Sequence, residues 1–167
     1  LIVGFGRIGQ SLIKRCRGFD MKVKVFDPFV NKETIESFGG QKIENLDDAL
    51  KFCDYISLHV PLVPETKSMI NSETLKKFKK GSALLNFSRE SIVDSAAVAE
   101  ALDQGVLSLF VSDFPVPGLL QHKRAIFTPH LGASTMEAEE NCAMMAAVQL
   151  RDFLLNGSIV NSVNFPS

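Results

Sequence analysis

The chain has 167 residues, which is long enough for one domain with a substantial core and too short for two ordinary domains. Hydrophobic residues make up 46% and charged residues 22%, the balance of a soluble globular protein. The formal net charge is −1 and like charges form no long runs, which argues against a nucleic acid as the main partner. No apolar stretch approaches the roughly 20 residues that span a bilayer, so we expect no membrane partner.

The first strand is expected over residues 1–3, and Gly4-Phe5-Gly6-Arg7-Ile8-Gly9 follows it directly. A helix over 10–17 then closes at Gly18. A second strand over 23–26 ends at Asp27-Pro28, and Asn31 can cap a helix that continues through Phe38 and stops at Gly39-Gly40. A short amphipathic helix over 46–52 precedes a third strand over 55–58.

After a proline-containing loop, Asn71-Ser72 can cap a helix that runs through Lys79. A fourth strand is expected over 83–85, and Asp94 caps a helix through Asp103. The fifth and sixth strands are expected over 107–111 and 125–127. Ser134-Thr135-Met136-Glu137 fits a capping box that opens a long helix ending near Asn156-Gly157.

Short apolar strands that alternate with helices indicate an α/β fold in which helices cover both faces of a parallel sheet. We therefore predict a doubly wound parallel sheet of the Rossmann type, with six strands in the order 3-2-1-4-5-6. Ligands of such sheets bind beyond the carboxyl ends of the strands, and every motif described below falls at such an end.

The glycine-rich turn after the first strand is predicted to hold a dinucleotide. Gly4 allows the tight turn, Gly6 leaves room for a pyrophosphate, and Gly9 lets helix and strand pack closely. The start of the next helix offers free N–H groups to the phosphates. Asp27 lies 18 residues after Gly9, where a carboxylate accepts from ribose hydroxyls and repels a 2′-phosphate. The cofactor is therefore predicted to be NAD; the alternative is a structural turn followed by a surface Asp.

Two further segments place catalytic side chains at strand ends. Asn86-Phe87-Ser88-Arg89 follows the fourth strand, and an arginine can grip a substrate carboxylate with two parallel hydrogen bonds. Thr128-Pro129-His130-Leu131-Gly132 follows the sixth strand, and the pKa of an unperturbed imidazole, about 6.5, suits proton transfer near neutral pH. We interpret Arg89 and His130 as a catalytic pair, although either residue alone has an ordinary structural explanation.

The chain resembles the NAD-binding domain of the D-isomer-specific 2-hydroxyacid dehydrogenases. The resembling segments are residues 4–9, 25–28, 57–62, 85–89 and 128–135, together with Thr66. The run from Glu139 to Pro166, with Asn156-Gly157 and residues 162–164, is similar to the family members that act on 3-phosphoglycerate in serine biosynthesis. The resemblance implies that substrate.

Carried over residue by residue, the resemblance implies that Arg89 binds the substrate carboxylate and that His130 is the acid/base. Asp113 would approach the nicotinamide carboxamide and completes the expected catalytic set. His59 to Pro61 would line the adenine side, while Thr66, Ser88 and Gly132 would lie near the pyrophosphate and nicotinamide. The full expected cofactor-binding set is Gly4, Gly6, Arg7, Ile8, Gly9, Asp27, His59, Val60, Pro61, Thr66, Asn86, Phe87, Ser88, Asp113 and Gly132.

The family builds its substrate domain largely from residues before the first Rossmann strand. Residues 1–167 are therefore expected to be the cofactor half of a two-domain enzyme, with the last ~10 residues running back towards the substrate domain. We expect this chain alone to bind NAD but to turn over slowly or not at all, because part of the substrate site is missing. The full-length protein is expected to be a homodimer or larger homo-oligomer.

Two features depart from the family pattern. The family has Asp-Val-Phe-x-x-Glu-Pro after the fifth strand, and that Glu is hydrogen-bonded to the catalytic His. Here the stretch reads Ser112-Asp113-Phe114-Pro115-Val116-Pro117-Gly118, without a Glu. We hypothesise that Asp113 or Glu90 takes its place. Glu90 itself stands where the family has Gly, and it is as well explained as a solvated loop residue.

Other site types and functions stay open to different degrees. The cysteines are Cys16, Cys53 and Cys142, and their odd number and apolar surroundings indicate reduced core thiols in a cytoplasmic protein. The histidines are His59, His122 and His130, and they show no metal-ligand spacing, so we expect no metal. Alternative functions are a dehydrogenase of glycerate, glyoxylate or lactate, and a non-catalytic NAD-sensing module. The methionines of the last helix are interpreted as core fillers: Met136, Met144 and Met145.

Overall fold

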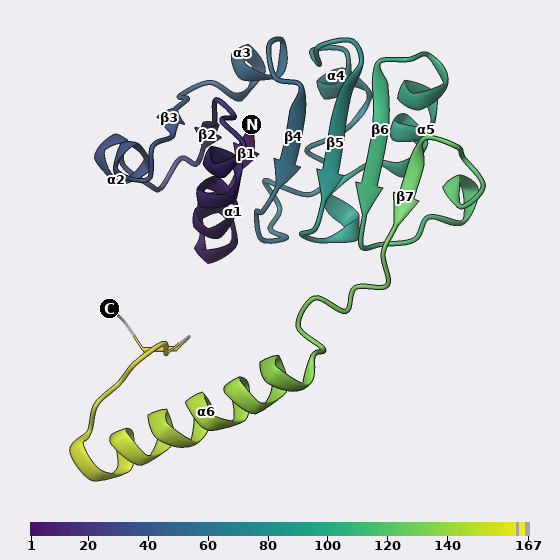
Figure 1. Ribbon diagram of the computed structural model, residues 1–167. Helices are drawn as coiled ribbons and strands as arrows, with labels where there is room; N and C mark the ends of the chain where they lie inside the picture. Colours follow the sequence, from purple (N-terminus) through teal and green to yellow (C-terminus); the bar gives the residue numbers. More distant parts are fainter. Residues whose placement is uncertain (163, 166–167) are drawn as a thin grey trace. The chain divides into compact units, whose positions relative to one another are not determined.

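A seven-stranded, all-parallel sheet organises residues 1–129 of the computed structural model, which describes residues 1–162 and 164–165 (Figure 1). The strands are β1 (Ile2–Val3), β2 (Lys24–Phe26), β3 (Gln41–Lys42), β4 (Tyr55–Leu58), β5 (Ser82–Asn86), β6 (Leu107–Ser112) and β7 (Ala125–Phe127). They lie in the order β3-β2-β1-β4-β5-β6-β7. The doubly wound parallel sheet predicted from the sequence is confirmed.

The strand β3 is the one that the sequence analysis missed, so the predicted count of six strands is corrected to seven. It contains only Gln41 and Lys42, neither of them apolar, and it forms an edge of the sheet. Residues 55–58, predicted as the third strand, pair with β1 instead of lying beyond β2. A two-residue polar edge strand leaves no period-2 pattern for sequence analysis to detect.

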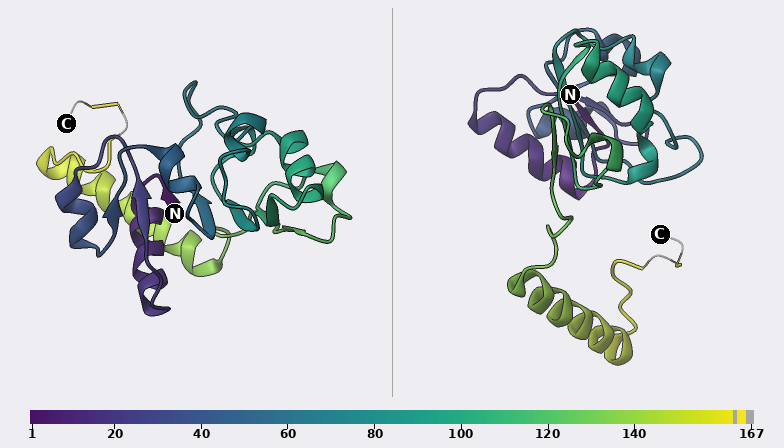
Figure 2. Two further views of the ribbon diagram at one scale, coloured as in Figure 1. Left: turned by 90° about the horizontal axis from the view of Figure 1, so that it is seen from above. Right: turned by 90° about the vertical axis from the view of Figure 1, so that its right-hand side faces the viewer.

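The helices are α1 (Arg7–Gly18), α2 (Lys32–Ser37), α3 (Leu46–Leu50), α4 (Ser72–Leu75), α5 (Ser95–Asp103) and α6 (Met136–Asn156), with two 3-10 turns, η1 (Glu90–Ile92) and η2 (Pro117–Leu119). Asn31, Asn71 and Asp94 cap α2, α4 and α5 through their side-chain oxygens, as predicted. The predicted end of the fourth helix at Lys79 is wrong, because α4 ends at Leu75. Figure 2 shows α1 and α5 on opposite faces of the sheet.

Apolar side chains alternate between the two faces of the sheet, and each face builds its own core. Ile2 packs in a cluster with Ile13 of α1 and Val25, whereas the next residue, Val3, packs in a second cluster with Leu58. This alternation follows from the period of two along a strand. Apolar clusters therefore pack against both faces of β1, directly before the glycine motif.

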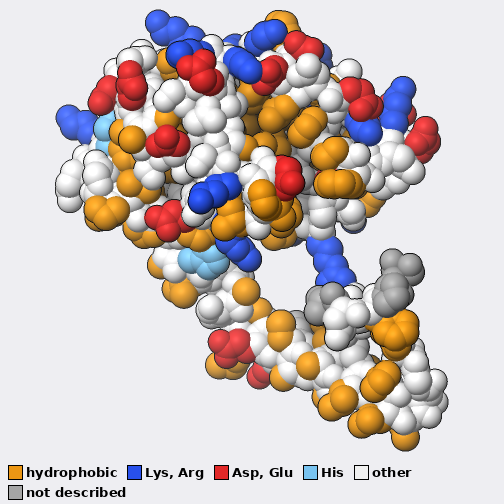
Figure 3. All heavy atoms as spheres, turned by 180° about the vertical axis from the view of Figure 1, so that it is seen from behind, with side chains coloured by type: hydrophobic (Ala, Val, Ile, Leu, Met, Phe, Trp, Pro, Cys, Tyr) orange, Lys and Arg blue, Asp and Glu red, His pale blue; other side chains and the backbone are white. Residues whose placement is uncertain are grey.

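The second unit, His130–Ser167, consists mainly of α6. Thr135 caps α6 by accepting a hydrogen bond from the Ala138 N–H at 3.2 Å, and Gly157 ends it with φ +66°. Both boundaries were predicted, although the cap is Thr135 alone. Among the described residues of α6 none is buried, and Figure 3 shows hydrophobic side chains along the helix with acidic ones near its start.

The interpretation of three α6 residues as core fillers is therefore wrong: Met136, Met144 and Met145 are exposed. Cys142 on the same helix is exposed too and Cys16 is half-buried, so only Cys53 is a core thiol, although all three cysteines are free. The α6 side chains are exposed because, among the described residues of this unit, no second helix or sheet lies against α6 to form a layer on which it could bury a face. The expected course of the last ten residues includes Val163, Pro166 and Ser167, which lie outside the described residues.

Among the helices that the structure describes, none combines the length and the apolar character needed to cross a membrane.

Candidate cofactor-binding and catalytic site

The glycine turn after β1 adopts a shape that only glycine permits at two of its positions. Gly4 has φ +92°, and a Cβ atom added there would lie 2.5 Å from the carbonyl oxygen of His59. A Cβ atom added at Gly9 would lie 2.5 Å from the carbonyl oxygen of Gly4. Both approaches are to backbone atoms, which cannot move aside without disturbing β4 or the turn itself. The first and last glycines of the motif are therefore required by the fold.

Gly6 differs from its two neighbours in the motif, because a Cβ atom added there would meet nothing within 4 Å. It is the N-cap of α1, with φ −71°; among the residues that the structure describes, no side chain caps this helix, and its first turn contains no acidic residue. The start of α1 therefore presents the features that bind an anion, backbone N–H groups and the positive end of the helix dipole. An open space over a helix start fits a pyrophosphate. The residues that follow, Arg7 and Ile8, form the first turn and are exposed.

Asp27, directly after β2, is tied to the glycine turn. Its Oδ2 accepts a hydrogen bond from the Phe5 N–H at 2.7 Å. Its Oδ1 accepts from the N–H groups of Phe29 at 2.9 Å and Val30 at 3.2 Å. A carboxylate offers about four acceptor positions, so these three bonds leave capacity for one further donor such as a ribose hydroxyl. The structural role of Asp27 in bracing the turn was missed by the sequence analysis.

The loop after β5 is held by the side chain of Asn86, which is only 1% exposed. Its amide nitrogen donates to the carbonyl oxygen of Arg89 at 3.0 Å, and its oxygen accepts from the Ser88 N–H at 3.2 Å. Ser88 is also buried, and its hydroxyl donates to the carbonyl oxygen of Leu58 at 2.6 Å. These bonds fix the backbone that carries Arg89, whose side chain is exposed at the carboxyl end of the sheet.

The neighbouring strand ends continue this polar row. The Asp113 N–H, after β6, donates to the carbonyl oxygen of Asn86 at 3.3 Å, and the Thr128 N–H, after β7, donates to that of Ser112 at 3.0 Å. The hydroxyl of Thr128 donates to the carboxylate of Asp113. The structure therefore brings Asn86, Ser88, Arg89 and Asp113 to one edge of the sheet. Thr128 joins them, although the sequence analysis gave it no role of its own.

His130 and Gly132 belong to the second unit. His130 is exposed and has φ +54°, a left-handed conformation that is sparsely populated by non-glycine residues and is enriched at functional sites. Arg89 lies in the first unit, so the pairing of Arg89 with His130 stays a prediction. Glu90 opens the turn η1 and is exposed, and its role as a partner of His130 stays a hypothesis as well.

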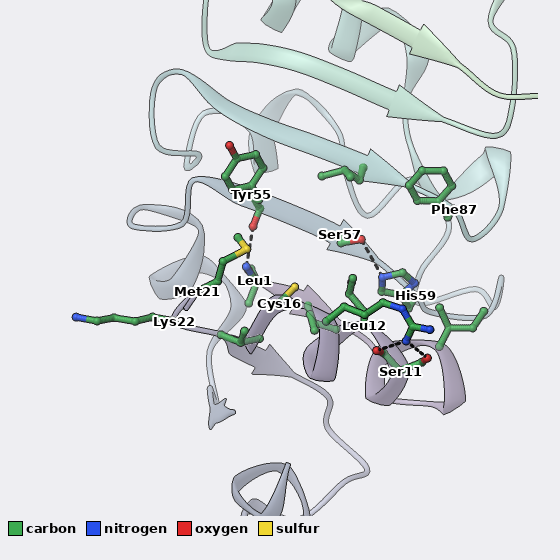
Figure 4. Close-up of a pocket in the computed structure, with 15 residues that line it drawn as sticks. Leu1, Ser11, Leu12, Cys16, Met21, Lys22, Tyr55, Ser57, His59 and Phe87 are labelled. Carbon is green, nitrogen blue, oxygen red and sulfur yellow. Dashed lines mark hydrogen bonds between the residues drawn. The ribbon is translucent and has the colours of Figure 1, made fainter. Parts of the chain in front are cut away.

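His59 lies beside an apolar cavity of about 690 Å³ on the face of β4 next to α1 (Figure 4). Tyr55 and Ser57 of β4 and His59 directly after it line the same cavity, as do Ile8 and Phe87 of the expected cofactor set. The hydroxyl of Ser57 and Nε2 of His59 form a hydrogen bond at 2.8 Å. Burial lowers the pKa of His59 from its ordinary value. His59 thus lines this cavity, and its backbone carbonyl lies against Gly4.

The loop after β4 is closed by Thr66. Its hydroxyl donates to the carbonyl oxygen of Pro61 at 2.6 Å and accepts from the Val63 N–H at 3.0 Å. Val60 is half-buried and Pro61 exposed at the start of this loop. Thr66 therefore shapes the loop that carries Val60 and Pro61.

A sequence model of a protein family, described as D-isomer specific 2-hydroxyacid dehydrogenase, NAD binding domain, matches residues 1–132. The D-3-phosphoglycerate dehydrogenase of Bacillus subtilis is 40% identical over 172 residues, which cover 99% of this chain and 33% of that relative. The chain thus spans about a third of the length of this relative.

Two solved structures show the same fold over nearly the whole chain. A glyoxylate reductase from Paecilomyes thermophila has a TM-score of 0.88 at 27% identity, covering 98% of this chain and 51% of that one. The NAD-complexed form of a D-isomer specific 2-hydroxyacid dehydrogenase from Lactobacillus delbrueckii ssp. bulgaricus has a TM-score of 0.85 at 25% identity, covering 98% and 55%. The chain therefore shares its fold both with a glyoxylate reductase and with a D-isomer specific 2-hydroxyacid dehydrogenase.

Proposed function

Because the chain belongs to the D-isomer specific 2-hydroxyacid dehydrogenase family, whose matching part is an NAD binding domain, we propose that it is the cofactor-binding part of an NAD-dependent oxidoreductase. The observation that carries this proposal is the glycine turn: an open helix start at Gly6, braced by Asp27 from the next strand. The full-length enzyme would transfer hydride between NAD and a D-2-hydroxyacid.

The cofactor is NAD, and the residues around the glycine turn fit it. The N–H groups at the start of α1 would hold the pyrophosphate, and the remaining acceptor position of Asp27 would take a hydroxyl of the adenosine ribose. A carboxylate at this place would repel the 2′-phosphate of NADP. Val60 and Pro61 would line the adenine side, and Asp113 would accept a hydrogen bond from the nicotinamide carboxamide.

Arg89 and His130 would carry the chemistry of the substrate. When bound, NAD supplies the hydride acceptor of the oxidation. The guanidinium of Arg89 would bind and orient the substrate carboxylate, helped by the rigid loop that Asn86 and Ser88 build. The imidazole of His130 would take the hydroxyl proton of the substrate in the oxidation and return it in the reduction.

The proposed substrate is 3-phosphoglycerate, oxidised to 3-phosphohydroxypyruvate for serine biosynthesis. The 40% identity to the Bacillus subtilis D-3-phosphoglycerate dehydrogenase and the C-terminal run ending in Asn164-Phe165-Pro166 support this choice. The structural likeness to a glyoxylate reductase favours a second candidate, a dehydrogenase of another small 2-hydroxyacid such as glycerate, glyoxylate or lactate. We also propose that the full-length protein is a cytoplasmic homodimer or larger homo-oligomer; the exposed apolar side chains of α6 support the oligomer.

Calorimetric titration of NAD into the folded chain tests the cofactor site. Gly6→Ala is the sharpest variant, since a Cβ atom there meets nothing within 4 Å and φ −71° suits alanine. The apo fold should be unchanged, whereas the added methyl group would occupy space that the pyrophosphate needs. NAD affinity should fall at least about tenfold. Gly18→Ala, which also meets nothing within 4 Å, should bind NAD like the wild type. Failure of the well-folded wild-type chain to bind NAD at about millimolar concentration would overturn the proposal.

The departures at Glu90 and at residues 112–118 favour a non-catalytic NAD-sensing module as the alternative from another functional class. Oxidation of NADH by the full-length protein with 3-phosphohydroxypyruvate and with glyoxylate decides among the three. Turnover with the first substrate, lost in Arg89→Ala and in His130→Gln, supports the phosphoglycerate enzyme. Turnover with glyoxylate alone supports the second candidate, and NAD binding without any turnover supports the sensor.

A further inference from the structure

The hydroxyl of Thr128 contacts the carboxylate of Asp113 at the carboxyl end of the sheet. Thr128 is the first residue after β7 and Asp113 the first after β6, and these two strands pair in parallel with Ser112 beside Phe127. The register continues for one residue, because the Thr128 N–H donates to the carbonyl oxygen of Ser112 at 3.0 Å. Both side chains are half-buried. The contact is thus built into the strand register.

Backbone bonds on both sides hold the residues that make this contact. The Asp113 N–H donates to the carbonyl oxygen of Asn86 at 3.3 Å. Ser112 is 1% exposed, and its hydroxyl accepts from the Phe114 N–H at 3.0 Å, which turns the chain directly after Asp113. A β-branched side chain such as that of Thr128 has few rotamers, so it presents its hydroxyl in one direction. The Asp113 carboxylate is therefore fixed from the β7 side.

We propose that Thr128 is a positioning residue, which orients the carboxylate of Asp113 towards the nicotinamide half of the cofactor. The inference rests on the proposed function, because it takes Asp113 as the acceptor for the carboxamide. A carboxylate that is already oriented loses no rotamer freedom when the carboxamide donates to it, so NAD is bound more tightly. Thr128 itself contacts neither cofactor nor substrate in this scheme; it acts through Asp113.

The test compares NAD with ADP-ribose, which has the adenosine, the pyrophosphate and the second ribose but no nicotinamide. Thr128→Val removes the hydroxyl and keeps the branched shape. It should bind ADP-ribose like the wild type and NAD about tenfold more weakly, the effect of losing one hydrogen bond to a charged group. Thr128→Ser keeps the hydroxyl and should restore most of the NAD affinity. Thr74→Val is the matched control, because it removes a hydroxyl that donates to the carbonyl oxygen of Met69. It should leave the affinities for NAD and ADP-ribose unchanged.

A double-mutant comparison keeps the inference falsifiable. Asp113→Asn should cause an NAD-specific loss of its own, and adding Thr128→Val or Thr128→Ala to it should cause no further loss. Equal weakening of NAD and ADP-ribose in Thr128→Val, or additive losses in the double variant, would overturn the positioning role. A wild-type chain that binds neither ligand would instead overturn the proposed cofactor site, so the two failures are distinguishable.

Discussion

The glycine turn after β1 and the loop after β5 lie at the same edge of the sheet but keep their shapes by opposite means. The turn depends on the absence of side chains, since Gly4 and Gly9 approach backbone carbonyls so closely that no Cβ atom fits. The loop depends on one polar side chain, since the buried amide of Asn86 forms hydrogen bonds with two backbone groups of its own loop. Adding atoms should therefore damage the first region, and removing them should damage the second.

Gly4→Ala is the strongest way to test the first half of this comparison. Alanine at φ +92° is strained, and its Cβ atom would lie 2.5 Å from the His59 carbonyl oxygen. We expect the variant to lose more than about 3 kcal/mol of unfolding free energy. Urea denaturation followed by circular dichroism measures the loss. Gly18→Ala, in the last turn of α1, is the control and should be neutral or slightly stabilising. A normal midpoint for Gly4→Ala would contradict the required positive φ.

Asn86→Ala tests the second half. It leaves the buried Ser88 N–H and the partly buried Arg89 carbonyl oxygen without their partner, and we expect a loss of about 2 kcal/mol of unfolding free energy. Asn71 offers a matched control, because its side chain also forms hydrogen bonds with several backbone groups but is less buried. Asn71→Ala should cost about 1 kcal/mol, a typical value for a helix cap. Equal losses in the two variants would show that burial of the Asn86 amide adds nothing.

The same contrast explains what the sequence could predict. The glycine turn was recognisable because its glycines and Asp27 stand at fixed spacings, and a spacing is visible in a sequence. The roles of Asn86 and Thr128 as braces were not, since each depends on which backbone or carboxylate group the tertiary register places beside it. The edge strand β3 escaped for want of apolar residues. The exposure of Met144 was missed because a helix pattern shows which residues are apolar and not what covers them.

Asp27→Asn tests a structural role and a binding role together, since Asp27 stabilises the glycine turn and is the proposed ribose ligand. The carboxylate accepts on both oxygens, whereas an amide must direct its NH₂ group at either Phe5 N–H or the N–H groups of Phe29 and Val30. We expect a stability loss of about 1 kcal/mol and NAD binding weakened by about tenfold. Calorimetry with NAD and NADP side by side should show reduced preference for NAD. An unchanged ratio of the two affinities would remove Asp27 from the ribose site.

The smallest expected effect is the pH dependence of stability that His59 causes. Its own carbonyl oxygen is the one that Gly4 approaches. Burial lowers the pKa of His59, and Nδ1 is buried with no hydrogen-bond partner among the described residues. The unfolded chain therefore binds more protons at this site than the folded one. Stability should fall as the pH drops through the unfolded pKa of about 6.5 and continue to fall until the lowered pKa is reached.

Thermal unfolding of the wild type and of His59→Gln between pH 7.5 and pH 5 measures this contribution as the difference between the two curves, because the other groups titrate in both proteins. His122→Gln is the comparison variant at another half-buried histidine, one that is paired with Asp103. The effect should be modest, because His59 is only partly buried and its charged form would keep part of its hydration. If acidification destabilised His59→Gln more than the wild type, folding would raise the pKa of His59 instead of lowering it, and the prediction would be wrong.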